Sequence, residues 1–148
     1  MKGGTRMADR RIALSAAAES SVVRRAETRL AADLTSLRES RRLVREWLTT
    51  RSQTELIPVA LVVVNVFVEN VLKHTGGAPM MRIESDGATA TIEVSDDSSA
   101  PAMRLPTPLK GSDMSGLAIV EALSRAWGST PTSSGKTVWA VVGPENQL

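Results

Sequence analysis

Four polar residues that could bind a charged ligand, Asn65, Glu69, Asn70 and Lys73, stand in an otherwise strongly apolar segment. If this segment is a helix, with about 100° of turn per residue, the four fall within one arc of roughly 140°. An amide oxygen is a suitable ligand for a hard cation such as Mg²⁺, and an ammonium group attracts phosphate oxygens. A polar arc on an apolar helix faces either a binding site or solvent, and the spacing alone leaves both readings open.

Two more positions have residue types suited to binding. Asp96 ends an alternating, strand-like run, where its carboxylate could accept hydrogen bonds from a ligand, although Asp is also a common first residue of turns. Gly116 and Leu117 stand where a helical pattern begins, and free backbone N–H groups there can hold phosphate oxygens. The chain contains no cysteine, which excludes disulfides, zinc–thiolate sites and thiol catalysis.

Two predicted helices must position the polar arc. From Thr35 the chain repeats apolar residues at helical spacing with arginines on the opposite side, so an amphipathic helix is expected to end near residues 49–52. The next apolar run is too long for a strand. Pro58 suits its first turn, and the pair Gly76 and Gly77 suits its end, so this run predicts a second helix.

The remaining segments predict strands, one more helix and a long loop. A first strand is expected within residues 21–31, a β-hairpin around the turn at Asp86 and Gly87, and a last strand in the run GKTVWAVVG. A helical pattern covers residues 117–126. Residues 98–115 lack apolar periodicity and are rich in Pro, Ser and Gly, which is typical of a functional lid or a disordered segment.

Together these elements predict one α/β two-layer sandwich over residues 9–148, preceded by a flexible leader at residues 1–8. The sheet is expected to be mixed but mostly antiparallel, with the helices on one face. A chain of 148 residues has the usual length of a single domain.

Charge and hydropathy restrict the partners. Residues 1–51 carry 12 Lys and Arg against 6 Asp and Glu, whereas residues 52–148 carry 6 against 10. The basic half suits an acidic partner or a solvated helix face, and the scarcity of aromatic residues argues against single-stranded nucleic acid. The apolar run Leu56–Leu72 is short and interrupted by polar residues, and Ile12–Ala18 is short for a signal-peptide core. We therefore expect a cytoplasmic protein without a membrane segment.

In their order along the chain, these features resemble the GHKL ATP-binding superfamily, and most closely its anti-sigma-factor serine kinase branch. The resemblance covers about residues 30–143. It rests on a basic amphipathic helix, an apolar helix ending N-V-L-K-H-T, a hairpin ending in Asp96, a long loop, a G-L-A-I-V helix and a G-K-T-V-W strand. It implies the Bergerat ATP-binding fold, with a site for ATP or ADP and Mg²⁺ between the helices and a lid.

The resemblance also implies roles for individual residues. Asn70 would ligate the Mg²⁺ that bridges the nucleotide phosphates, and Lys73 would meet phosphate charge. Asp96 would accept a hydrogen bond from the adenine amino group, with Thr137 as its water-bridging partner.

The phosphate end of the implied site departs from the family pattern. Gly116 and Leu117 would hold phosphate oxygens at the start of the last helix. Family glycines are replaced at Ser98, Ala100 and Met114. Ser98 and Ala100 are small enough to keep a pocket open, whereas a methionine at the lid hinge would change how the phosphates are held.

The expected general base is also replaced. In the kinase branch a glutamate stands four residues before the magnesium-binding asparagine, and here that position is Val66, which cannot take a proton. Glu69 is the nearest alternative, but it immediately precedes Asn70 and its side chain points elsewhere. His74, the single histidine, ends the helix, so the chain is not an autonomous histidine kinase.

The function implied is that of an ATP-binding regulator that docks on a sigma-like factor or its antagonist. The family suggests a homodimer. The replaced base leaves open whether the chain has serine/threonine kinase activity. The alternative is a non-catalytic interaction module with a degenerate or nucleotide-gated site. A third hypothesis is DNA contact through Arg41, Arg42 and Arg45 of the basic helix.

Overall fold

A computed structural model describes residues 24–75, 77–96, 112–133 and 135–148 of the chain. The predicted leader at residues 1–8 lies outside this part, as do residues 98–111 of the predicted lid. The described elements, in chain order, are β1 (Arg24–Arg29), α2 (Thr35–Thr50), the short 3₁₀ helix η1 (Thr54–Leu56), α3 (Ile57–His74), β2 (Met80–Ser85), β3 (Ala90–Ser95), α4 (Ser112–Leu123), β4 (Ala126–Pro131) and β5 (Lys136–Val142).

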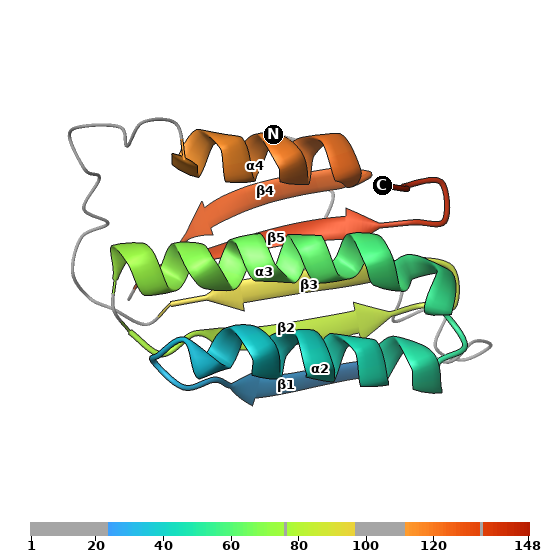
Figure 1. The fold of residues 1–148 in the computed structure, drawn as a ribbon, viewed down its shortest axis with the longest axis horizontal. Helices are drawn as coiled ribbons and strands as arrows, with labels where there is room; N and C mark the ends of the chain where they lie inside the picture. The colour runs from blue at the N-terminus through green and yellow to red at the C-terminus, as the bar shows by residue number, and fades with distance from the viewer. Residues whose placement is uncertain (1–23, 76, 97–111, 134) are drawn as a thin grey trace.

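The five strands form one sheet in the order β1-β2-β3-β5-β4, with the three helices on one of its faces (Figure 1). Each neighbouring pair among the described strands is antiparallel, so the prediction of a mixed sheet was wrong. The reason is the tight turn between β4 and β5, where the Thr132 N–H donates to the Gly135 carbonyl at 2.9 Å. This turn brings β5 back between β3 and β4, antiparallel to both.

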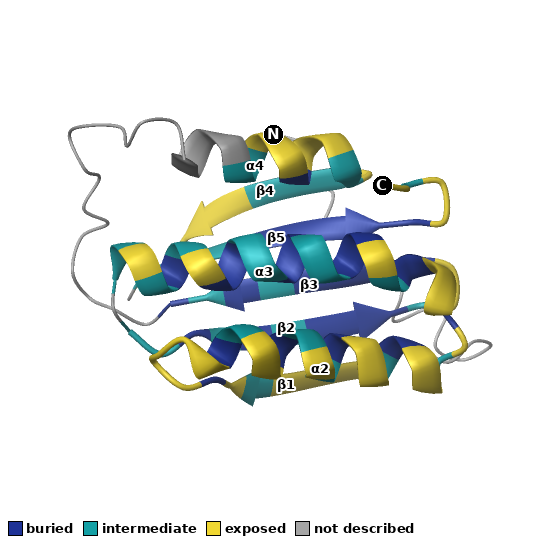
Figure 2. Ribbon diagram, in the orientation of Figure 1, coloured by how far each residue is buried: buried dark blue, intermediate teal, exposed yellow. Residues whose placement is uncertain are grey.

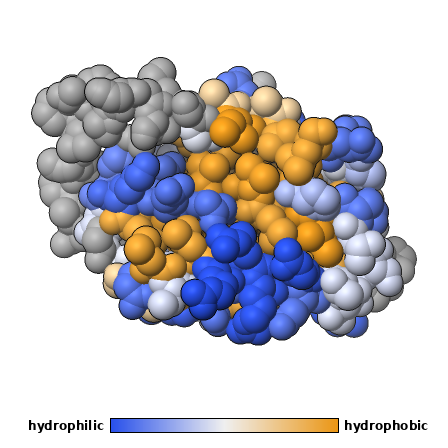
Figure 3. All heavy atoms as spheres, viewed as in Figure 1, coloured by the Kyte–Doolittle hydropathy of each residue, from blue (hydrophilic) through white to orange (hydrophobic). Residues whose placement is uncertain are grey.

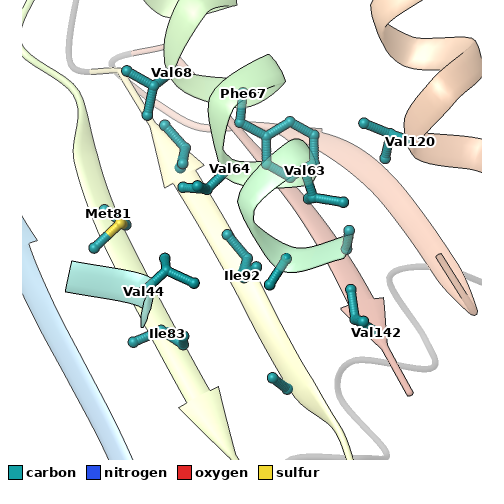
Figure 4. Close-up of a cluster of buried hydrophobic side chains, with 14 of the residues drawn as sticks. Val44, Val63, Val64, Phe67, Val68, Met81, Ile83, Ile92, Val120 and Val142 are labelled. Atoms are coloured by element: carbon teal, nitrogen blue, oxygen red, sulfur yellow. The ribbon is translucent and has the colours of Figure 1, made fainter. Parts of the chain in front are cut away.

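The hydrophobic core lies between the sheet and the helices. Alternate residues of β2, β3 and β5 point to the helices, as the two-residue period of a strand requires. They meet the buried face of α3, which runs across the middle of the sheet (Figures 1 and 2). Figure 4 shows Val63, Val64, Phe67 and Val68 of α3 above Ile92.

The most apolar segment of the chain forms α3. Thr54–His74 is long and apolar enough to cross a membrane, with a mean hydropathy of 1.9. In the structure, seven residues of α3 are buried, and the helix packs on β3 and β5. Packing between a sheet and two flanking helices accounts for this composition, because a helix contacted on several sides is apolar around most of its circumference.

Two predicted helices agree well with the structure, while the third does not. α2 begins at Thr35, as predicted, and the Asp33 carboxylate accepts a hydrogen bond from the Thr35 N–H at 2.9 Å. The last helix, predicted over 117–126, instead spans Ser112–Leu123.

β4 was absent from the sequence prediction. Its residues lack an alternating apolar pattern, and within it Trp127 is the large apolar side chain that packs against the core. The strand is stabilised by pairing with β5, with Gly128 opposite Trp139. A Cβ at Gly128 would come within 2.7 Å of the Trp139 ring, so the glycine leaves the space that the ring occupies.

Candidate functional site

The C-terminal ends of α3 and β3, the start of α4 and the start of β5 lie at the same end of the molecule (Figure 1). This end, which we call the candidate site, holds the described residues for which the sequence implied nucleotide binding. α3 packs against β3, β5 and α4, so these elements have a defined arrangement.

The polar residues of α3 have two different environments. Asn65 accepts a hydrogen bond at 2.6 Å from the Arg41 guanidinium, so it belongs to the contact with α2. Asn70 lies further along the helix and is half-buried, whereas Glu69 and Lys73 are exposed. The single arc inferred from the sequence is therefore a structural contact at one end and a candidate ligand-binding face at the other.

Val66, one turn before Asn70, packs directly against α4. A Cβ built on Gly116 would lie 3.1 Å from a Val66 methyl carbon, which is closer than an ordinary side-chain contact. The glycine therefore lets α4 approach α3 at this point. Residues at i and i+4 share a helix face, so Asn70 points to the same side of α3 as Val66, toward α4.

Asp96 is buried at the end of β3, with 6% of its surface exposed. Its N–H donates to the Lys136 carbonyl at 3.2 Å, which ties the strand end to β5. Its carboxylate lies against Gly135, where a Cβ would come within 2.1 Å of Oδ1 and 2.6 Å of the Asp96 carbonyl oxygen. The position of the carboxylate therefore requires glycine at position 135.

Thr137 is close to Asp96 along the ladder, but its side chain is directed elsewhere. It pairs with Ser95, and the next pair, Val94 with Val138, points into the core. Since successive side chains alternate between faces, Thr137 points to the sheet face away from the helices. The structure thus brings Asp96 together with Gly135 and Lys136 and does not direct the Thr137 hydroxyl into the helix-bearing layer.

Gly116 does not begin the last helix, contrary to the prediction. α4 starts at Ser112, so the free backbone N–H groups of its first turn belong to residues 112–115. One internal glycine costs a helix only about 1 kcal/mol, so Gly116 is compatible with a helix that begins earlier. Leu117 follows as a half-buried residue within the helix.

The remaining predicted residues lie outside what the structure describes. Ser98 and Ala100 precede α4 in the undescribed segment, and no side chain is described at Met114. Their implied roles stay predictions.

Several basic residue types stand at the candidate site. Lys73 and His74 occupy the last turn of α3, and Lys136 starts β5. Among the described residues, no three His, Cys, Asp or Glu side chains gather in an arrangement that could hold a metal.

Sequence reasoning missed Gly135 as a site residue. The available signal was its place in G-K-T-V-W, directly before the last strand, where an isolated glycine often marks a close approach of another group. The partner in that approach is distant in sequence, so the run itself did not reveal it.

Comparison with known protein-family models and with curated proteins finds no match to this chain.

Proposed function

We propose that this protein is a nucleotide-gated regulatory module, of the Bergerat fold, that binds ATP or ADP with Mg²⁺ and docks on another protein without transferring phosphate. The observation that carries the proposal is the contact between Val66 and Gly116. At the position where the resembling kinases have a general base, this chain has an apolar side chain that packs one helix against another.

The candidate site supports nucleotide binding through two oxygen-bearing side chains. Asn70 supplies a half-buried amide on the face of α3 that points to α4, suited to one coordination position on a phosphate-bound Mg²⁺. Asp96 supplies a carboxylate fixed at the end of β3, suited to accept a hydrogen bond from an amino group. Both lie at the end of the molecule where α4 presents its free N–H groups.

The surface of α3 and α4 supports the docking half of the proposal. On the face that carries the helices, an apolar area extends over α3 and α4 beside the strongly polar surface of α2 (Figure 3). On these two helices, Leu61 and Val62 of α3 are half-buried and Ile119 of α4 is 43% exposed. Contiguous exposed apolar surface next to a polar rim is typical of a protein-binding site.

The docking partner that the resemblance favours is a sigma-like factor or its antagonist, in a cytoplasmic setting and with the protein as a homodimer. Nucleotide bound between α3 and α4 would change the packing of the same two helices that carry the apolar area. This shared use of α3 and α4 is how nucleotide would gate docking.

A serine/threonine kinase is the second candidate function, and exposed Glu69 is the observation in its favour. Its carboxylate is free to reach solvent one residue before Asn70. It is turned by about 60° around the helix from Val66, the position of the expected base, however, since three residues advance by about 300°. A base at that angle would serve a protein hydroxyl poorly.

Calorimetric titration tests the nucleotide site. We expect the intact protein to bind ADP with Mg²⁺, and Asp96→Ala to bind it about 10- to 100-fold more weakly, since a hydrogen bond to a charged group contributes about 1.5 to 3 kcal/mol. Asn70→Ala should weaken binding only when Mg²⁺ is present. Glu55→Ala, which removes an exposed carboxylate from η1, is the control and should bind as the intact protein does. No nucleotide binding by the intact, folded protein would exclude the proposal.

Restoring the acidic residue tests the absence of catalysis. We expect the intact protein to release phosphate from Mg-ATP at the background rate and Val66→Glu to release it at least tenfold faster, because a positioned general base contributes about 10²- to 10⁴-fold. Val66→Gln has the same size without a basic carboxylate and should stay at background. Phosphate release by the intact protein well above background would show that Val66 does not prevent the reaction.

A further inference from the structure

A second region with binding features lies away from the candidate site, where α2 covers β1. Two cavities occur there, and both are lined by Thr50 and Arg51 at the end of α2. The two cavities therefore adjoin each other along α2 and β1. In Figure 1, β1 forms one edge of the sheet beneath α2.

The first cavity is apolar and has a volume of about 290 Å³. It exists because the side chains that β1 turns toward α2 are small. Ala26 and Thr28 pair with Ile83 and Met81 of β2, so all four point to the helix-bearing face, where they line the cavity. Leu43 and Trp47 of α2 form the opposite wall.

The second cavity is cationic and has a volume of about 300 Å³. Its lining includes Arg24, the first residue of β1, and Arg51, together with the polar side chains of Ser52, Gln53 and Ser85. None of the described residues that line it carries a carboxylate. Two guanidinium groups without an acidic neighbour in the lining make an environment suited to an anion.

Arg51 is held in place by packing. Its guanidinium lies 4.4 Å from the centroid of the Trp47 ring, a cation–π contact, and its buried Nε has no hydrogen-bond partner. The ring is itself oriented, because Trp47 Nε1 donates to the Ser85 hydroxyl at 2.8 Å. A guanidinium positioned in this way loses little freedom when it binds an anion.

β1 offers backbone groups along the same line. It pairs with β2 on one side, and the described part of the chain has no strand on its other side. Five of its six residues are exposed, as Figure 2 shows. A free edge strand can pair with an added strand through its N–H and C=O groups.

We propose that this groove binds an extended peptide that ends in an apolar residue with a free carboxylate, added to β1 as a sixth, antiparallel strand. The apolar side chain would occupy the first cavity, and the carboxylate the second, beside Arg24 and Arg51. The direction follows from the order of the lining residues, since the cationic cavity lies at the start of β1 and the apolar one further along it. A peptide whose C-terminus lies at Arg24 must therefore run antiparallel to β1.

The charge of the groove supports this occupant. Arg24 shares the helix-bearing face with Ala26 and Thr28, and with Arg51 it gives the second cavity its positive charge, whereas Glu27 and Glu46 line the first cavity. A carboxylate is therefore favoured at the Arg24 end of the groove and not in the first cavity. An alkyl carboxylate would satisfy both cavities as well, but it would leave the free edge of β1 unpaired. Backbone pairing with the edge of β1 therefore distinguishes a bound peptide from a bound small amphipathic acid.

Nuclear magnetic resonance titration with defined probes tests this proposal. The peptide acetyl-Ser-Thr-Val-Thr-Val-Leu with a free carboxylate should shift the amide signals of β1 and the indole N–H signal of Trp47, and should slow hydrogen exchange at the outer edge of β1. The same peptide with a terminal amide should bind at least about tenfold more weakly, because it loses the charge-assisted hydrogen bonds. This comparison needs no variant and so does not depend on a variant's folding.

Variants and a small acid complete the test. Arg51→Met keeps an apolar stem on the Trp47 ring and should weaken binding of the free-acid peptide about tenfold. Arg45→Met, on the exposed side of α2, should leave the affinity for this peptide unchanged. Equal binding of the acid and amide peptides, or no shift in β1, would overturn the proposal. Octanoate binding at Trp47 as tightly as the peptide, without slowed exchange in β1, would also overturn it, in favour of a small-acid site.

Discussion

Replacing Phe67 by alanine is expected to lower the free energy of unfolding by about 3 to 5 kcal/mol, the usual cost of removing a buried aromatic ring. Phe67 is fully buried and is among the largest buried side chains of the protein. In Figure 4 it points from α3 toward Val120 of α4, so its removal would leave a cavity where the two helices and the sheet meet. Against a typical stability of about 5 to 15 kcal/mol, this is a large share.

Urea unfolding, followed by circular dichroism, measures this effect. Ile119→Ala is the matched control, since it also shortens an apolar side chain on a helix but at a position that is 43% exposed. Its stability should change by no more than about 0.5 kcal/mol. A loss below about 1 kcal/mol for Phe67→Ala would contradict the close packing of α3 against α4.

Replacing Gly135 by alanine is expected to cost about 3 kcal/mol of stability and to displace the Asp96 carboxylate. The added Cβ would meet Asp96 Oδ1 at 2.1 Å and the Asp96 carbonyl oxygen at 2.6 Å. The second contact is with backbone, which cannot rotate away, so the strand end must move and overpacking strain results. Nucleotide affinity should fall together with stability if Asp96 contributes to binding.

Gly87→Ala separates this steric effect from the general cost of losing a glycine. Gly87 has a φ of 92°, but a Cβ there would have no neighbour within 4 Å. Its replacement should therefore cost about 1 kcal/mol of backbone strain and leave nucleotide binding unchanged. Thermal unfolding and the ADP titration measure both quantities, and equal effects of the two substitutions would show that the Asp96 contact is unimportant.

The two proposed binding regions use opposite ends of the helix layer. The candidate nucleotide site lies at the C-terminal end of α3, whereas the cationic cavity lies at the C-terminal end of α2, close to where η1 and α3 begin. The Arg41–Asn65 hydrogen bond joins α2 to α3 between the two regions. The nucleotide-binding proposal and the peptide-binding proposal can therefore be tested separately, and a negative result for one leaves the other unchanged.

Local sequence patterns were sufficient for the elements whose own residues specify them. α2 and α3 have long helical repeats, β2 and β3 alternate around the turn after Asp86, and β5 is a compact apolar run. A layer of helices packed on the sheet follows from these elements, because their apolar residues must be buried against one another. The place of Asp96 at a strand end could be predicted in the same way.

The tertiary structure decided the features that depend on partners distant in sequence. β4 exists because β5 pairs with it, and the sheet is antiparallel throughout its described strands because a tight turn reverses the chain there. Asn65 is bound to α2 rather than turned to a ligand, since Arg41 lies across from it.

The polar arc of α3, formed by Asn65, Glu69, Asn70 and Lys73, shows the same division. Helical periodicity determined that Asn70 shares a face with Val66, because that relation depends only on the turn per residue. What this face meets depended on α4 and its glycine at position 116, which allows the close approach. The sequence therefore determined which residues stand together on each element, and the packing of the elements decided which of them meet another helix, a strand end or an open groove.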